Sequence, residues 1–113
     1  MTVENIVQLL KDTGFTIDVD HPDHIDMEKI GDLPLPFAEV MTSENEIFAD
    51  GVKYITTTDV TLRLLSDRPF ASDLDEQRAI HTLEAFGLRV SRTNSDEFFD
   101  GDGLYLNEFT MEV

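Results

Sequence analysis

The sequence predicts a mixed α/β (α+β) domain in which a four-stranded mixed sheet carries two helices on one face, in the chain order α-β-β-α-β-β. Apolar residues recur at helical spacing in two segments, 2–13 and 73–86. Four other segments have the β-branched or alternating pattern of strands, at residues 37–43, 54–65, 88–93 and 104–113. The length of 113 residues suits one domain, in which both helices bury the apolar face of the sheet.

Both helices have predictable ends. Thr2 is expected to cap the first helix, and Gly14 to end it. Asp73 and Glu76 have the spacing of a capping box at the start of the second helix, and Gly87 closes its far end. One side of the first helix is apolar at Val3, Ile6, Val7 and Leu10. The side of the second helix that should face the sheet carries Ala79, Ile80, Leu83 and Phe86.

The segments between these elements are predicted to be irregular. Residues 15–36 form an extended connection, because Pro34 and Pro36 prevent a helix or a central strand. Residues 44–53 form a loop centred on the turn signal Asp50-Gly51, too long for a tight hairpin. An acidic turn spans residues 94–103. If the strands at 54–65 and 88–93 are parallel neighbours, the crossover through the second helix should be right-handed.

Apolar side chains also lie where solvent is expected. The outer side of the second helix carries Leu74, His81 and Ala85. Either these side chains are exposed to solvent, as some apolar atoms are in every protein, or they contact another subunit. Phenylalanines in or beside the predicted loops are either buried by the loop folding back or anchor a neighbouring subunit. The candidate interface residues are Phe48, Tyr54, Leu74, His81, Phe98 and Phe99.

The charge is strongly and unevenly negative. The chain has 24 acidic and 8 basic residues, for a net charge of −16. This sign disfavours tight binding to nucleic-acid backbones and to anionic membranes. Residues 15–50 hold Lys29 as their sole base, and their acids are Asp18, Asp20, Asp23, Asp26, Glu28, Asp32, Glu39, Glu44, Glu46 and Asp50. The acidity serves either solubility or a surface that repels something negative.

The chain offers little catalytic or metal-binding chemistry. Without cysteine it has no disulfide, thiolate nucleophile or cysteine zinc site. It has no glycine-rich phosphate loop and no serine in a Gly-x-Ser-x-Gly setting. His21 and His24 lie in an acidic segment, 18–29, that is similar to a calcium loop but has Asp23 at its sixth position and Lys29 at its twelfth. We expect no enzyme activity, no metal and no cofactor.

Three segments resemble a known family. They are residues 33–40 (LPLPFAEV), 47–54 (IFADGVKY) and 60–67 (VTLRLLSD), followed by an acidic helix and two closing strands. In order and spacing, over nearly the whole chain, they are similar to the tail completion, or tail-to-head joining, proteins of long-tailed phages of Gram-positive bacteria, which are relatives of the tail terminators.

The resemblance implies a virion protein, made in the host cytoplasm, that forms a ring, commonly a hexamer. Such a ring caps the tail tube, stops its growth and docks the connector of the head, so its partners are copies of itself, the tube protein and the connector protein. The genome passes through the channel, and an acidic wall would repel its phosphates. Candidate acids for this channel or docking surface are Glu44, Glu46, Asp50, Asp96, Glu97, Asp100 and Asp102.

Two other functions remain open. The first is a small acidic DNA mimic that inhibits a nucleic-acid-binding protein. The second is a neighbouring neck or tail component with the same small fold. The acids concentrate in predicted loops around an orderly core, whereas a DNA mimic would spread them over much of its surface, so the sequence favours the ring.

Overall fold

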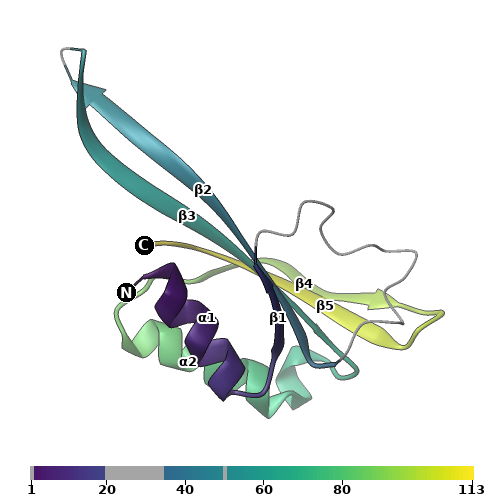
Figure 1. Ribbon diagram of the computed structural model, residues 1–113. Coiled ribbons are helices and arrows are strands. Elements are labelled where there is room, and N and C mark those ends of the chain that lie inside the picture. The colour runs from purple at the N-terminus through teal and green to yellow at the C-terminus, as the bar shows by residue number, and fades with distance from the viewer. Residues whose placement is uncertain (1, 20–34, 50) are drawn as a thin grey trace.

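The computed structural model describes residues 2–19, 35–49 and 51–113, and its strands form one mixed sheet with two α-helices on one face (Figure 1). The sheet order is β1-β2-β3-β5-β4, in which β1 and β2 are parallel and the other neighbours antiparallel. The α+β class is thus confirmed, but the predicted four strands are five. The elements in chain order are α1 (Val3–Asp12), β1 (Thr16–Val19), β2 (Phe37–Ala49), β3 (Val52–Ser66), the 3-10 helix η2 (Phe70–Ser72), α2 (Leu74–Ala85), β4 (Ser91–Phe99) and β5 (Leu104–Glu112).

The additional strand is β1, which lies in a segment predicted to be irregular. It pairs with residues 37–40 of β2, and the N–H of Thr16 donates to the carbonyl of Pro36 over 2.9 Å. A strand of four residues is too short to show an alternating pattern, and its formation depends on a neighbour more than twenty residues away along the chain. The rest of the predicted connection, residues 20–34, lies outside the described residues.

The predicted loop at 44–53 is wrong, because β2 and β3 form a long hairpin there. β2 continues to Ala49, and β3 begins at Val52. Gly51 has a φ of 76°, which suits the second position of a tight turn between two twisted strands. The polar residues of this stretch indicated a loop, but side chains at 43–46 are exposed, so the strands there need no apolar face.

The second hairpin also differs from the prediction. β4 spans 91–99 in place of 88–93, and the acidic turn is confined to residues 100–103. Register shifts between Arg92, Asn94 and Glu97 interrupt the alternation that a strand pattern depends on. β5 lies between β3 and β4, so the strands expected as possible parallel neighbours do not touch.

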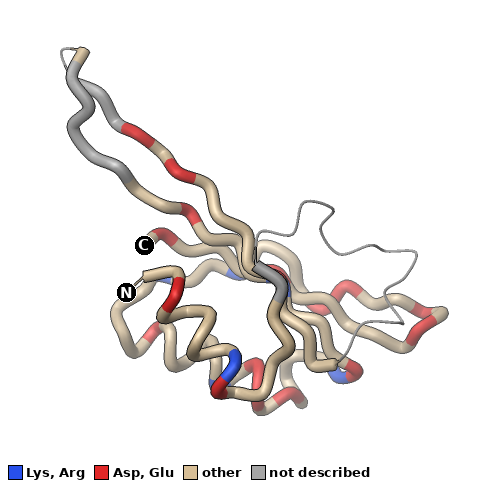
Figure 2. Tube along the Cα trace, viewed as in Figure 1, with Lys and Arg blue, Asp and Glu red and all other residues tan. Residues whose placement is uncertain are grey.

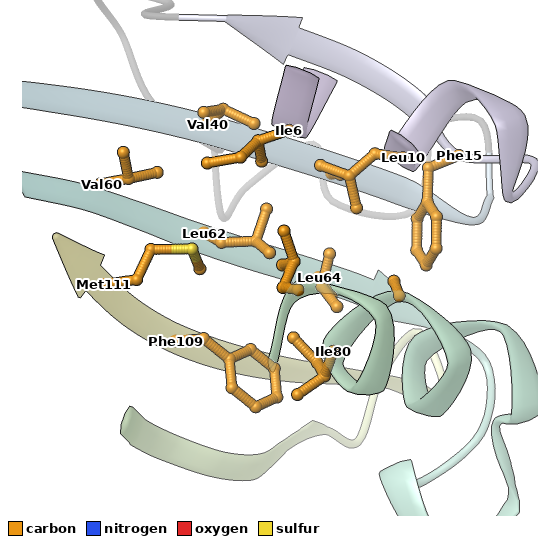
Figure 3. Packing of buried hydrophobic residues seen from close by; sticks show 13 residues of the cluster. Ile6, Leu10, Phe15, Val40, Val60, Leu62, Leu64, Ile80, Phe109 and Met111 are labelled. Atoms are coloured by element: carbon orange, nitrogen blue, oxygen red, sulfur yellow. The ribbon is translucent and has the colours of Figure 1, made fainter. Parts of the chain in front are cut away.

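The main core lies between the helices and the sheet (Figure 3). Thr2 caps α1 and Asp73 caps α2, as predicted, and three of the four residues expected to face the sheet from α2 are buried. The fourth, Phe86, is 67 % exposed, because it is the cap residue beyond the last helical turn. The sheet contributes Ala38, Val40, Val60, Leu62, Leu64, Phe109 and Met111, and the helices Ile6, Leu10, Ala79, Ile80 and Leu83.

A second apolar cluster lies on the other face of the sheet, because neighbouring residues of a strand point to opposite faces. Leu64 belongs to the helix-side core, whereas Leu65 belongs to this second cluster. Its buried members are Phe37, Leu65, Leu104 and Leu106, and Phe99 packs against them. On the same face Arg63 forms ion pairs with Glu108 at 2.9 Å and with the buried Glu39 at 3.5 Å.

The core makes a direct prediction about α2. Leu83 has no exposed surface, so Leu83→Ala leaves a cavity and should lower the free energy of unfolding by about 2–5 kcal/mol. Leu74 on the same helix is 69 % exposed, and Leu74→Ala is the control, expected to change it by less than about 0.5 kcal/mol. Urea unfolding followed by circular dichroism measures both. Equal losses would contradict the packing of α2 on the sheet.

Candidate functional site

A two-stranded arm projects from the body of the molecule. β5 pairs with β3 only along residues 59–66, whereas β2 pairs with β3 out to Ala49 and Val52. Residues 43–49 of β2 and 52–58 of β3 therefore extend past β5. Figure 1 shows that this arm projects away from the two helices. At about 3.4 Å per residue the arm adds roughly 20 Å, which explains a longest dimension of 53 Å against 30 and 21 Å across.

The base of the arm is polar. Residues 43–46 are all exposed, and the side-chain amide of Asn45 donates to the carboxylate of Asp59 on the neighbouring strand. Glu44 lines a groove whose other wall includes Lys11 and Val7 of α1. Two predicted interface residues, Phe48 and Tyr54, have their backbones in the arm, but their side chains lie outside the description, as does Asp50.

The predicted acidic residues do not form one surface. Glu44 and Glu46 lie on the arm, whereas Asp100 and Asp102 lie in the turn between β4 and β5 at the opposite end of the sheet (Figure 2). Glu97 is exposed near that turn and accepts a hydrogen bond from Asn94. These predicted acids therefore lie at two ends of the molecule, and other acids lie on the helices (Figure 2).

The predicted apolar contacts are also dispersed. Leu74 and His81 are exposed on the outer side of α2. Phe98 and Phe99 belong to β4 and not to a loop: Phe98 is 49 % exposed and its ring lies 4.7 Å from that of Tyr105, while Phe99 packs on the second apolar cluster. Leu74 and His81 on α2 and Phe98 and Phe99 on β4 thus belong to different elements of the body, apart from the arm.

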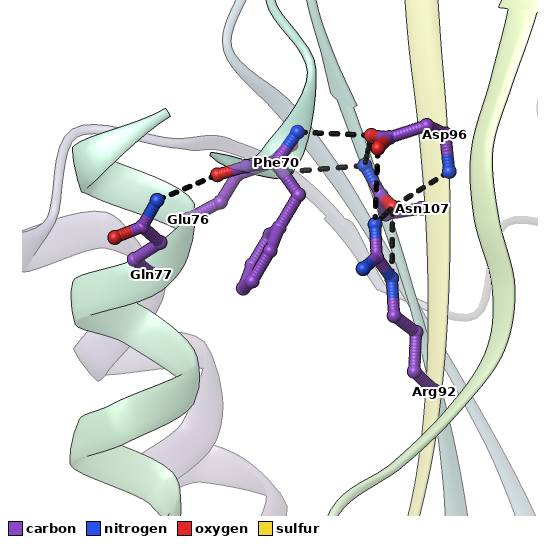
Figure 4. A network of polar contacts seen from close by, with 6 residues as sticks. All are labelled: Phe70, Glu76, Gln77, Arg92, Asp96 and Asn107. Carbon is purple, nitrogen blue, oxygen red and sulfur yellow. Dashed lines mark hydrogen bonds and ion pairs between the residues drawn. The ribbon is translucent and has the colours of Figure 1, made fainter. Parts of the chain in front are cut away.

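A buried polar network, not predicted from the sequence, joins β4 and β5 to the start of α2 (Figure 4). Its centre is Asn107 on β5, which is fully buried. The Asn107 carbonyl oxygen accepts from the guanidinium of Arg92 and from the backbone N–H of Asp96 at 2.9 Å. The Asn107 amide nitrogen donates to Asp96 at 3.1 Å and to Glu76 at 3.4 Å.

Asp96 belongs to this network and not to an exposed acidic surface. Its carboxylate accepts from the backbone N–H of Phe70 at 2.9 Å and lies 3.4 Å from Arg92. Burial alone would raise the pKa of Asp96, but the hydrogen bonds from Phe70 and Asn107 and the charge of Arg92 outweigh it, so the pKa is lowered. Its φ of 46° is unusual for a residue other than glycine, and these contacts hold it.

Glu76 is the most perturbed acid of the network. It has no exposed surface, and its Oε1 has no hydrogen-bond partner among the described residues. The pKa of Glu76 is raised from 4.5 to about 8 by burial, which removes the carboxylate from water, and by the charges of Asp73 and Asp96, while Arg92 opposes the shift. In place of closing the predicted capping box, this side chain turns toward Asn107, although Asp73 accepts from the N–H of Glu76 at 3.1 Å.

The network attaches η2 and the start of α2 to the sheet. The hydroxyl of Ser66 donates to the carboxylate of Asp73, which also accepts from the backbone N–H of Glu76 at the start of α2. The guanidinium of Arg92 also lies over the ring of Phe70, 4.7 Å from its centre, and so attaches η2 to β4. A buried asparagine among the alternating apolar residues of β5 was the one signal in the sequence that could have revealed this network.

No protein-family model matches the chain, and no curated protein matches its sequence significantly. Within the described ranges, no group of three or more histidine or acidic side chains could hold a metal ion. The hypothesis on His21 and His24 lies outside those ranges. None of the described helices is long and apolar enough to cross a membrane.

Glu76 makes stability depend on pH. Below pH 4.5 it is protonated in both the folded and the unfolded chain. Between 4.5 and about 8 the unfolded chain loses this proton while the folded protein keeps it, so the free energy of unfolding falls as the pH rises. Glu76→Gln replaces the acid by a neutral side chain of the same shape. The free energy of unfolding of the variant, relative to that of the wild type, should therefore rise by on the order of 3 kcal/mol between about pH 5 and about pH 9.

Urea unfolding at both pH values measures this difference. Glu97→Gln makes the same change at an exposed carboxyl group and is the matched control, with no pH-dependent gain expected. If the free energy of unfolding changed with pH by the same amount in Glu76→Gln and in the wild type, Glu76 would not be held neutral in the folded protein.

Proposed function

We propose that this chain is a non-catalytic assembly protein that forms a ring, caps a phage tail tube and joins it to the connector of the head. The observation that carries the proposal is the projecting arm of β2 and β3. Two strands that pair only with each other are marginally stable in water, because they bury little apolar surface. Such an arm becomes stable when a neighbouring subunit covers it.

The position of the family-like segments supports this function. Residues 47–49 and 52–54 lie at the far end of the arm, and residues 37–40 begin β2 inside the body. The segment 60–67 supplies the part of β3 that is buried between the helices and the second cluster. The likeness to tail completion proteins therefore includes both a packed body and the part that reaches out of it.

The distribution of charge supports the proposal as well. Acids on the arm and acids in the β4–β5 turn lie at opposite ends of the sheet. In a ring, one end would meet the tube or the connector, and exposed carboxylates that face the opening would repel the phosphates of passing DNA. Two buried acids contribute little to either surface: Glu76 belongs to the network around Asn107, and Glu39 pairs with Arg63 on the other face of the sheet.

Mass in solution and electron microscopy, with and without purified tail tubes, test this function. A ring, or a monomer that becomes a ring on tubes, is the expected result. A stable monomer that ignores tubes but binds a cationic DNA-binding protein would overturn the proposal and favour the DNA mimic.

A shortened variant makes the test specific to the arm. Ser43 and Asp59 face each other across the hairpin, so a two-residue Asn-Gly turn in place of residues 44–58 closes it. The deletion also removes the two backbone hydrogen bonds between Thr58 and Val113. This variant should keep the circular dichroism and cooperative unfolding of the wild type and lose the ring and tube binding. Rings that persist without the arm would contradict its role.

A further inference from the structure

Little apolar surface holds η2 and the first turn of α2 to the sheet. Residues 67–68, 71–72 and 74–75 are exposed, and no residue of η2 is buried. From η2, Phe70 packs against the helix-side core, where its ring lies 5.7 Å from that of Phe109. The buried side chains of this stretch are two acids, Asp73 and Glu76. Its attachment to the sheet therefore depends mainly on polar contacts.

η2 and the start of α2 form one unit, which we call the junction segment (residues 67–77). The side-chain amide of Gln77 donates to the carbonyl of Phe70 at 2.7 Å, and the N–H of Asp73 donates to the same carbonyl at 3.1 Å. The carboxylate of Asp73 in turn accepts from the N–H of Glu76 at 3.1 Å. These bonds join residues within the segment, so they do not have to break if the segment moves away from the sheet.

Three contacts that hold the junction segment to β4 and β5 pass through the network in Figure 4. The N–H of Phe70 donates to Asp96 at 2.9 Å, and the guanidinium of Arg92 lies over the ring of Phe70, 4.7 Å from its centre. The amide of Asn107 donates to Glu76 at 3.4 Å. Because Asn107 also bonds to Arg92 and Asp96, a change at one of these contacts affects the others.

The surroundings of Glu76 favour its neutral form. Its side chain is fully buried, and its Oε1 has no hydrogen-bond partner. The charges that face it are those of Asp73 at the start of its own helix and of Asp96 and Arg92 from β4. β5 contributes the neutral amide of Asn107, and the described residues of η2 and β3 add no charge. A carboxylate here would meet two negative charges and one positive charge, without water.

Opening of the junction segment would remove this penalty. Water would then reach Glu76, whose pKa would return from about 8 toward the ordinary value of 4.5, and its proton would pass to the solvent. Below pH 4.5 both forms keep the proton, and the closed form has its full stability. As the pH rises from 4.5 to about 8, each opening releases a proton, so the open form becomes progressively more favoured.

We infer that Glu76 is a proton-controlled latch: with its proton it holds the junction segment against β4 and β5, and loss of the proton releases this segment while the sheet and the later turns of α2 stay folded. Ala79, Ile80 and Leu83 keep those later turns in the core. Opening of one segment with few apolar contacts costs less free energy than global unfolding. The inference does not depend on the proposed assembly function.

Native-state hydrogen exchange, read by NMR for single amides of the intact protein, tests the latch. The N–H of Phe70 bonds to Asp96 in the closed form and reports on the junction segment, whereas the N–H of Leu64 in the central strand β3 reports on global unfolding. Between about pH 5 and about pH 8 the protection factor of Phe70, corrected for the intrinsic exchange rate, should fall by on the order of a hundredfold.

Urea separates local opening from global unfolding. At concentrations below the unfolding transition, the protection factor of Phe70 should change little, because opening of the junction segment exposes little surface. That of Leu64 should be larger at every pH and should fall steeply with urea, because the whole core is exposed when β3 unfolds.

Two variants assign the pH dependence to Glu76. Glu76→Gln keeps the size of the side chain and has no proton to lose, so the protection factor of Phe70 should vary by less than about threefold over the same pH range. Glu97→Gln makes the same change at an exposed carboxyl group and should retain the fall seen in the wild type.

Three results would overturn the inference. The first is a wild-type protection factor of Phe70 that does not change with pH. The second is exchange of Phe70 at the rate of Leu64 and with the same dependence on urea, because the junction segment would then open only when the whole protein unfolds. The third is an equal fall with pH in Glu76→Gln and in the wild type, because another group would then control the opening.

Discussion

Strand β3 pairs with β2 along one edge and with β5 along the other, and both helices pack on the face it presents with Val60, Leu62 and Leu64. These three side chains have no exposed surface, and the next residue, Leu65, is equally buried on the opposite face. The other elements are positioned by this strand: β2 determines where β1 lies, and β5 determines where β4 lies. The arm is the same strand continued beyond the region that the helices cover.

The body and the arm are held by different physical means. In the body, apolar burial is supplemented by the network around Asn107, which ties η2 and the start of α2 to β4. Its neutral Glu76 and paired Asp96 show how a very acidic chain can keep carboxyl groups inside without placing unbalanced charge there. In the arm, the described strands β2 and β3 pair with each other beyond the end of β5. In the proposed function, assembly completes this element.

The negative charge is distributed unevenly between the body and the arm. Acids at the base of the arm and in the β4–β5 turn are exposed at opposite ends of the sheet, whereas β3 within the arm is nearly free of charge. Electrostatic repulsion between copies would keep most of their surfaces apart.

Local patterns were sufficient to predict both α-helices with their N-terminal caps and the helix-side core of α2 up to Leu83, because these features depend on residues a few positions apart. They could not predict β1, the position of β5 between β3 and β4, or the burial of Asn107 against Glu76, because each depends on contacts between distant segments. The arm shows the limit most clearly. A polar stretch ending in Asp-Gly is equally compatible with a loop and with a solvent-exposed two-stranded ribbon. Only the tertiary structure decides between them, because it extends β3 past the end of β5.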